Sequence, residues 1–240
     1  MKKLFFIIYA LLLSMTIPHN AYAMHIAEGF LPLKWCVFYF VLVIPFLYLG
    51  LRKLKKLTLK NKEIKILLGV MAAFVFMMSA LKIPSVTGSS SHPTGTGIGA
   101  IIFGPVIMCV ISVVVLLFQA LLLAHGGLTT LGANLLSMGI VGPFVAYGIY
   151  RLFKNKNELF AVGLAAALGD LTTYIITSIQ LGISFQGTMN EIITHIVEFM
   201  GIFAVTQIPL AIVEGIISVI IYDFIKKHCA AELSEIMEVE

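Results

Sequence analysis

The residues of this sequence best suited to chemistry are Met24 and His25, which together can chelate a metal ion. If the chain begins at Met24, its α-amine, the amide nitrogen of His25 and Nδ1 of the His25 imidazole close fused five- and six-membered rings in one plane. A fourth nitrogen, from His92, would complete a square. Square-planar nitrogen sites suit Ni(II), Cu(II) and, by electronic similarity, low-spin Co(II), whereas Ca²⁺, Mg²⁺ and tetrahedral Zn²⁺ fit them poorly. Because an α-amine titrates at about pH 8, metal affinity is expected to fall as the pH drops.

The chelate requires cleavage of the chain after Ala23, and the first residues have the features of a signal peptide. Lys2 and Lys3 form a basic end, residues 4–15 an apolar stretch, and Ala21-Tyr22-Ala23 a small-x-small cleavage site. The alternative is an uncleaved first transmembrane helix, which the shortness of the apolar stretch disfavours. We predict a signal peptide over residues 1–23, a single transmembrane helical domain over 24–229, and an acidic, frayed cytoplasmic tail over 230–240.

The composition indicates an integral membrane protein. Of the 240 residues, 60% are hydrophobic and 12% are charged, whereas soluble domains have about half apolar residues and about a quarter charged ones. The three cysteines are an odd number and form no CxxC pair, which excludes a disulfide scaffold and a cysteine metal cluster. The net charge of +4 is explained by membrane topology and does not indicate a nucleic-acid partner. The chain is expected to lie in membrane lipid.

The number of membrane crossings depends on one apolar block. The blocks after residue 24 lie at about 35–51, 66–84, 97–124, 131–150, 159–181 and 200–225. The third is interrupted at Gly104-Pro105, where proline tends to end a helix. Splitting it there places twelve Lys and Arg side chains inside and two outside, whereas one continuous span places seven on each side. Because short cytoplasmic loops retain basic residues, we predict an all-α protein with about seven passages, one of them short or re-entrant. Its mature N-terminus lies outside the cell and its C-terminus in the cytoplasm.

Other polar residues are candidates for the site or for the path of the ion. His92 lies in a loop rich in Gly, Ser and Thr, and His125 and His195 are expected on the same face of the membrane. These two histidines could line an access route, although ordinary interfacial histidines are commoner. Asp170 and Glu214 lie inside predicted helices, where a carboxyl is costly and usually functional or partnered. Structural hydrogen bonding and functional coupling both stay open for them.

Further residues have expected roles in packing. Glu28 is close enough in sequence to hold the N-terminal segment in place. Asn134 and Gln119 are expected to form hydrogen bonds between helices. Small residues at 161, 165 and 169 form a stripe on one helix, which favours internal packing or, as the alternative, docking to a partner subunit.

Two motifs carry a resemblance to a known family. They are Met24-His-Ile-Ala-Glu-Gly-Phe-Leu-Pro32 and Ser89-Ser-Ser-His-Pro-Thr-Gly-Thr-Gly-Ile-Gly99, the second followed by Phe103-Gly-Pro105. Over essentially the whole mature chain, the sequence resembles the CbiM family. These are the substrate-capture membrane subunits of energy-coupling-factor cobalt transporters, and the NikM nickel subunits are related to them. The resemblance implies a seven-helix subunit whose metal ligands are the amine of Met24, the amide and imidazole nitrogens of His25, and His92.

The resemblance also implies partner subunits. The sequence has no GxxxxGK[ST] motif, so the chain cannot hydrolyse ATP by a P-loop mechanism and is not expected to be an enzyme. In the family, ATP hydrolysis belongs to a CbiO-type ATPase, which works with a CbiQ-type coupling membrane protein and a small CbiN-type membrane protein. The implied function is capture of Co(II) from the extracytoplasmic side for cobalamin biosynthesis, with no resident cofactor.

Three alternatives stay open. Ni(II) suits the same ligands, although the Ser-Ser-His-Pro-Thr-Gly sequence of the loop more closely resembles the cobalt branch of the family. A secondary transporter or channel for divalent cations would place ionisable groups along a path through the bilayer midplane, whereas the histidines here are expected on one face. An intramembrane metalloenzyme would need an open coordination position and a general base, and the sequence has no HExxH motif.

Overall fold

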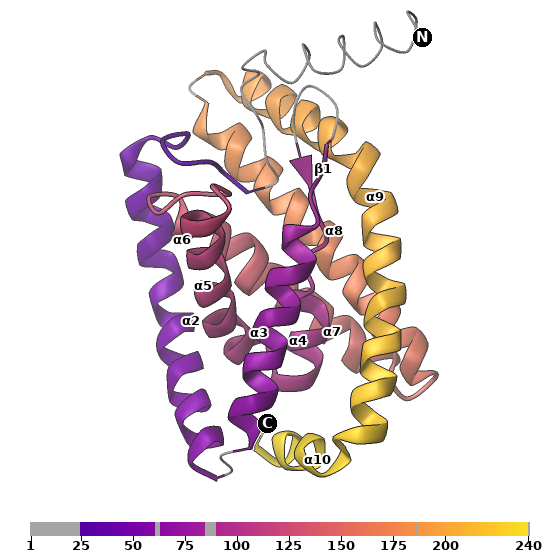
Figure 1. Cartoon of the computed structure of the whole chain (residues 1–240). Coiled ribbons are helices and arrows are strands. Elements are labelled where there is room, and N and C mark those ends of the chain that lie inside the picture. The colour runs from indigo at the N-terminus through magenta and orange to yellow at the C-terminus, as the bar shows by residue number, and fades with distance from the viewer. Residues whose placement is uncertain (1–24, 61–62, 85–89, 186, 240) are drawn as a thin grey trace, which may run out of the picture.

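The structure, a computed structural model, describes residues 25–60, 63–84, 90–185 and 187–239. The predicted signal peptide and the predicted ligand Met24 lie outside these ranges. Helices form almost all of the described chain (Figure 1). The elements in chain order are α2 (Leu33–Lys60), α3 (Ile64–Ala80), β1 (Ile83–Pro84), β2 (Ser90–Ser91), α4 (Thr96–Phe103), α5 (Pro105–Leu122), α6 (Leu131–Asn134), the π-helical segment η2 (Leu135–Val141), α7 (Gly142–Phe153), α8 (Glu158–Ser184), α9 (Met189–His228) and α10 (Ala230–Val239). The two short strands pair antiparallel.

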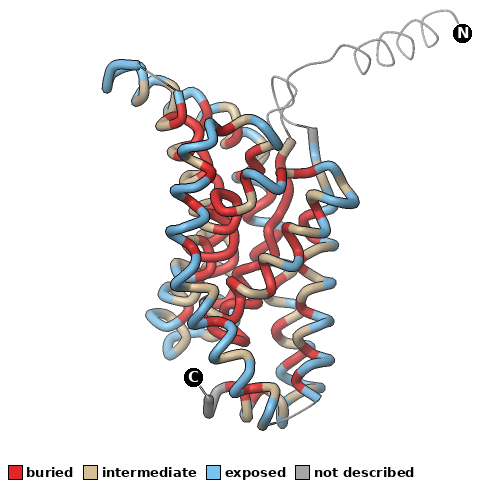
Figure 2. Tube along the Cα trace, turned by 90° about the vertical axis from the view of Figure 1, so that its left-hand side faces the viewer, coloured by how far each residue is buried: buried red, intermediate tan, exposed pale blue. Residues whose placement is uncertain are grey.

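Five helical segments in the described ranges are long and apolar enough to cross a membrane. They are Leu33–Leu59, Pro105–Leu122, Leu131–Phe153, Glu158–Ser184 and Met189–His228, while α3 is a shorter apolar helix of 17 residues. Buried residues line the inside of the bundle and exposed ones its outside (Figure 2). Many exposed side chains are large and apolar, among them Phe118, Ile208 and Ile216. An apolar exterior of this extent suits lipid, which confirms an all-α membrane protein; the count of seven passages stays a prediction.

The third apolar block is broken where the sequence predicts a break. α4 ends at Phe103 and α5 begins at Pro105, and Gly104 between them has a φ of 81°. Glycine adopts this backbone conformation without the steric cost of a side chain. Pro105 suits the first position of α5, where the backbone N–H has no partner within the helix. All eight residues of α4 are buried, so this short helix is enclosed by other helices, as irregular backbone at membrane depth must be.

The small residues of α8 pack against helices of the same chain. The stripe at 161, 165 and 169 is buried, and a Cβ at Gly169 would lie 2.9 Å from the Cβ of Ala146 in α7. Between α8 and α9, a Cβ at Gly215 of α9 would lie 2.7 Å from the carbonyl oxygen of Gly163 of α8. Small residues between membrane helices allow such close approach. Internal packing therefore explains the stripe.

The C-terminal segment forms the helix α10, so the expected frayed tail is wrong. Leu233 and Ile236, three residues apart, are buried in the same hydrophobic core as Tyr222 and Ile225. An apolar pair at this spacing gives a short helix one face to bury. α10 packs against α4 and α9 and lies at the end of the bundle opposite β1 (Figure 1).

Candidate metal centre

Three histidines from three separate segments meet inside the bundle. His25 precedes α2, His92 follows β2 and His125 follows α5, and each is at most 3% exposed. Nδ1 of His25 lies 2.8 Å from Nε2 of His92 and 3.0 Å from Nε2 of His125. One nitrogen of each ring lies within 4.8 Å of the others, a spacing that can hold a metal ion. These residues are called the histidine cluster below.

Hydrogen bonds on the far side of two rings direct free lone pairs into the cluster. Nδ1 of His92 lies 2.9 Å from the carbonyl oxygen of Pro93, which can only accept, so Nδ1 carries the proton and Nε2 keeps a lone pair. Nε2 of His25 lies 3.2 Å from the thioether sulfur of Met138, a weak acceptor; in the tautomer in which Nε2 donates to this sulfur, Nδ1 keeps its lone pair for a metal. Metal-binding histidines are usually held through their second nitrogen in this way.

The nitrogen spacing matches adjacent positions around one ion. Two ligands that are each about 2.0 Å from a metal, and at right angles to one another, lie about 2.8 Å apart. The distance from His25 to His92 is 2.8 Å and that from His25 to His125 is 3.0 Å. Without a metal, a proton on Nδ1 of His25 can bridge such a pair as a hydrogen bond; with a metal ion, the facing lone pairs share its positive charge. The cluster is therefore suited to a cation.

The three imidazoles are held neutral, which is the form that binds metals. Burial lowers the pKa of His92 to about 4 and the pKa of His125 to about 2. The pKa of His25 is also well below its usual value, first because of burial and then because of the nearby His125 and His92. Burial acts this way because the charged imidazolium is poorly solvated. At neutral pH the cluster thus offers nitrogen lone pairs with little competition from protons.

The segment that carries His25 is fixed by residues that follow His125. The side-chain amide of Asn134 bonds both backbone groups of Ile26: Oδ1 accepts from the N–H at 2.8 Å, and Nδ2 donates to the carbonyl oxygen at 3.1 Å. The Thr130 hydroxyl donates to the same carbonyl oxygen at 2.7 Å. The expected role of Asn134 between helices is therefore wrong, because its side chain binds the N-terminal segment instead.

Glu28 holds the same segment against the loop of His125. Its carboxylate accepts hydrogen bonds from the backbone N–H of Thr129, at 3.1 Å, and from the Thr129 hydroxyl. These hydrogen bonds lower the pKa of Glu28. The two segments are so close that a Cβ at Gly127 would lie 2.6 Å from Cα of Glu28. The expected positioning role of Glu28 is confirmed by these contacts.

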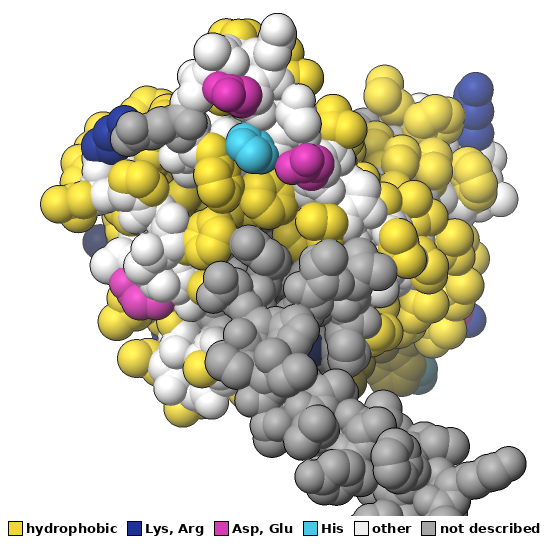
Figure 3. All heavy atoms as spheres, turned by 90° about the horizontal axis from the view of Figure 1, so that it is seen from above, with side chains coloured by type: hydrophobic (Ala, Val, Ile, Leu, Met, Phe, Trp, Pro, Cys, Tyr) yellow, Lys and Arg dark blue, Asp and Glu magenta, His cyan; other side chains and the backbone are white. Residues whose placement is uncertain are grey.

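The remaining candidates lie outside the histidine cluster. His195 is partly exposed, and its Nδ1 lies 3.2 Å from a carboxylate oxygen of Glu198. Figure 3, a view of the molecule from above, shows a histidine side chain at the surface with acidic side chains nearby. Asp170 and Glu214 are fully buried in α8 and α9, where they contact residues around the His92 loop. Gln119 donates to a serine of α3, which confirms its expected role between helices.

The sequence names His125 only as a candidate for an access route, whereas the structure places it in the histidine cluster. Its neighbours Ala124 and Gly126 have φ values of 46° and 75°, so the chain turns sharply on both sides of the histidine. The Gly126-Gly127 pair is the local signal for such a turn. A turn signal does not say which way the side chain points, and its direction becomes clear only from the fold.

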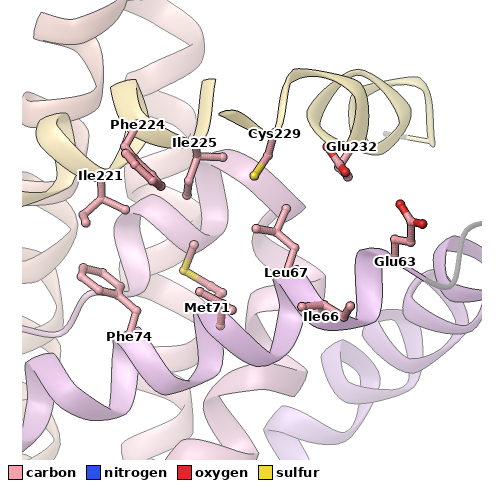
Figure 4. Close-up of a pocket in the computed structure, with 11 residues that line it drawn as sticks. Glu63, Ile66, Leu67, Met71, Phe74, Ile221, Phe224, Ile225, Cys229 and Glu232 are labelled. Carbon is pink, nitrogen blue, oxygen red and sulfur yellow. The ribbon is translucent and has the colours of Figure 1, made fainter. Parts of the chain in front are cut away.

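An apolar groove lies between α3 and α9, away from the histidine cluster (Figure 4). It has a volume of about 470 Å³, and no histidine is among the described residues that line it. Apolar side chains form most of its wall, with Glu63 and Glu232 at one end. Nitrogen ligands are concentrated elsewhere, so this groove does not compete with the histidine cluster as a cation site. Its apolar lining includes Ile66, Leu67, Met71, Phe74, Ile221 and Phe224.

Comparison with known proteins finds similarity over nearly the whole chain. The family model described as "CbiM: Cobalt uptake substrate-specific transmembrane region" matches residues 25–231. The "Cobalt transport protein CbiM" of Clostridium tetani is 57% identical over 235 residues, which cover 97% of this chain and 97% of that protein. The protein of the same name from Desulforamulus reducens is 55% identical over 211 residues, 88% of this chain and 84% of that protein.

Two solved structures have a similar fold. A transition metal transporter matches with a TM-score of 0.74 and 27% identity, over 85% of this chain and 92% of that chain. A truncated transition metal transporter matches with a TM-score of 0.75 and 26% identity, over 85% of this chain and 99% of that chain. The helical arrangement is thus shared with proteins described as metal transporters.

Proposed function

The chain belongs to the CbiM family of cobalt-uptake membrane proteins, and we propose that it is the subunit that captures Co(II) outside the cell for an ATP-driven importer. The observation that carries the proposal is the convergence of buried, neutral nitrogens on Nδ1 of His25. Such a site favours binding of a transition metal over binding of Mg²⁺ or Ca²⁺, which take oxygen ligands. Cobalt captured in this way would supply cobalamin biosynthesis.

Four nitrogens form the metal plane in this proposal. They are the α-amine of Met24, the amide nitrogen and Nδ1 of His25, and Nε2 of His92. In the plane, Nε2 of His92 must lie opposite the amide nitrogen and beside Nδ1, which agrees with their separation of 2.8 Å. The site requires cleavage of the signal peptide after Ala23, because an uncleaved chain has an amide in place of the amine.

His125 supports cobalt as the cargo. Its Nε2, 3.0 Å from Nδ1 of His25, is within reach of a fifth, axial position. Low-spin Ni(II) has a filled axial d orbital and favours four ligands in a plane, whereas low-spin Co(II) has a half-filled one and accepts a fifth ligand. Geometry of this kind distinguishes metals that bind the same ligand types. Ni(II) stays the alternative cargo, because the four planar nitrogens suit it as well.

Transport requires partner subunits in addition to this chain. With seven passages, the mature N-terminus outside and the C-terminus in the cytoplasm, the histidine cluster faces the outer side of the cell membrane. The ion binds there and is enclosed by the loops that carry His92 and His125. The partners then reorient the subunit so that the ion leaves inward: a CbiO-type ATPase supplies the energy, and CbiQ-type and CbiN-type membrane proteins complete the importer.

Cobalt accumulation in cells without an importer of their own tests this function. The chain is expressed alone, with the three partner types, and with the partners when the ATPase carries an inactivating substitution. We expect accumulation only with the active ATPase, because the chain itself has no nucleotide-binding motif. Equal accumulation by the chain alone would identify a secondary transporter or channel and would contradict the proposal.

A further inference from the structure

Two carboxyl groups lie inside the membrane-spanning helices next to the metal centre. Asp170 in α8 and Glu214 in α9 are both 0% exposed. In the part of the chain that the structure describes, no Lys or Arg forms an ion pair with either of them. A carboxyl is expensive at membrane depth and is retained there for a function. The contacts of these two groups indicate what that function is.

Glu214 binds the turn that follows His92. Its carboxylate accepts from the backbone N–H of Thr94 at 2.5 Å, from the Thr94 hydroxyl at 3.0 Å, and from the backbone N–H of Gly95 at 2.9 Å. Gly95 has a φ of 68°, so the chain turns sharply here before α4 begins. A single side chain of α9 thus fixes the backbone two and three residues after His92.

Asp170 acts through Gln207, which touches His92 directly. Nε2 of Gln207 donates to Oδ2 of Asp170 at 2.6 Å and to the carbonyl oxygen of His92 at 3.2 Å. A side-chain amide could face His92 with either its oxygen or its nitrogen. Oδ2 of Asp170 accepts from the amide nitrogen and so fixes which way the amide faces. The same NH₂ group then donates to the carbonyl oxygen of His92. The hydroxyls of Ser91 and Thr206, 2.7 Å apart, hold the preceding residue to α9 as well.

We propose that Glu214 and Asp170 are positioning residues that hold His92 at the metal, an inference that rests on the proposed function. Metal ligands must be held within about 0.5 Å of the productive geometry, and His92 stands in a loop that has no long helix of its own to hold it. α8 and α9, which pack side by side (Figure 1), supply the support.

The inference predicts weaker metal binding when Glu214 no longer holds the turn after His92. In a Glu214→Gln variant, an NH₂ group replaces one of the two oxygens that accept from Thr94 and Gly95, so one backbone N–H of the turn loses its acceptor and His92 moves from its place. The three nitrogens of Met24 and His25 remain. Metal affinity should fall by about 10- to 100-fold, the usual effect of losing a group that orients a ligand. The visible absorption of bound Cu(II) should shift to that of the His92→Ala variant, because both lack the same nitrogen.

A double-substitution cycle tests whether Glu214 acts through His92. Calorimetric Co(II) titrations compare the mature protein with Glu214→Gln, His92→Ala and the combined variant, and Glu198→Gln serves as an exposed carboxyl control. We expect Glu214→Gln to have no further effect when His92 is absent. Additive losses, or a Glu214→Gln protein with native affinity and spectrum, would overturn the inference. Unchanged binding by His92→Ala would overturn the proposed function instead.

A milder variant covers the case in which Glu214→Gln does not fold. Gln207→Met keeps both carboxyls and nearly the same side-chain volume, but it cannot donate to the His92 carbonyl oxygen. We expect weaker Co(II) binding and a shifted Cu(II) absorption, with both effects absent in the His92→Ala background. Native affinity and absorption in a folded Gln207→Met protein would count against the inference.

Discussion

The two ends of the bundle each contain a polar cluster, and the clusters are built in opposite ways. In the histidine cluster, buried neutral rings meet nitrogen to nitrogen around Nδ1 of His25, and they have no charged group of their own. At the other end, the hydroxyls of Tyr150 and Tyr222 lie 3.1 Å apart and both donate to Glu158, which also pairs with Lys226. This second group, called the tyrosine cluster, contains its own donors, its own anion and its own cation.

The contrast separates a binding site from a structural contact. Buried acceptors need donors or a positive charge, because an unpaired polar group is costly inside a protein. The tyrosine cluster satisfies its acceptors with its own hydroxyl and ammonium groups. The histidine cluster gains a shared positive charge when a metal ion binds. Substitutions in the first should therefore change stability, and substitutions in the second should change metal binding.

The largest effect is expected for His92→Ala. Losing a ligand should weaken Co(II) binding by more than about 100-fold, beyond the range of about 10- to 100-fold that is typical for an orienting group. Calorimetric titration of the mature protein in detergent measures this. His195→Ala is the matched control, since His195 pairs with Glu198 at the surface, and it should bind normally. Similar losses in both variants would remove the distinction between clustered and surface histidines.

The pH dependence of stability should also come from the histidine cluster. Burial lowers the pKa of His92 to about 4, whereas an unfolded histidine titrates at about 6.5. Between these values the unfolded chain binds more protons, so the folded state loses stability as the pH falls from about 6.5 toward about 4. The thermal midpoint of metal-free protein should drop over this range, and that of His92→Asn should drop less. Identical pH profiles would contradict the expectation.

A smaller and metal-dependent effect is expected for His125→Ala. If His125 supplies an axial nitrogen, its loss should weaken Co(II) binding by about tenfold, or about 1.4 kcal/mol, and Ni(II) binding by less. Parallel titrations with the two ions give the ratio directly. Equal losses for both ions would mean that His125 shapes the site without selecting the metal.

The smallest effect on the metal is expected at the tyrosine cluster. Tyr222→Phe removes the hydroxyl that donates to Glu158 at 2.7 Å. The free energy of unfolding should fall by about 1 kcal/mol, while the Co(II) affinity stays at its native value. Denaturant unfolding and calorimetry on the same preparation check both. A change in affinity as large as that of His125→Ala would show that the two ends are coupled.

The sequence predicts much of this arrangement because some residues act locally. Proline after glycine ends α4 and starts α5 through backbone chemistry alone. The pairing of His25 with His92 follows from motifs that resemble a known family, and the structure brings the two rings together.

Other features depend on contacts between distant segments. Asn134 binds the backbone of Ile26, 108 residues away, so no local pattern reveals its partner. His125 enters the cluster through a sharp turn whose direction is set by packing. α10 lies against the bundle because Leu233 and Ile236 pack into its hydrophobic core. The acidic composition of the segment does not indicate this packing.

The most direct test of the account is Co(II) titration of the mature protein beside a form extended at its N-terminus. A Gly-Ser-Gly segment placed before Met24 keeps every side chain but moves the α-amine away from His25, and the same segment placed after Glu240 is the control. We predict one tightly bound Co(II) for the native and C-terminally extended proteins, and a loss of more than about 100-fold for the N-terminal extension, as for a lost ligand. Equal binding by all three proteins would contradict the terminal chelate and would leave a conventional site of His25, His92 and His125.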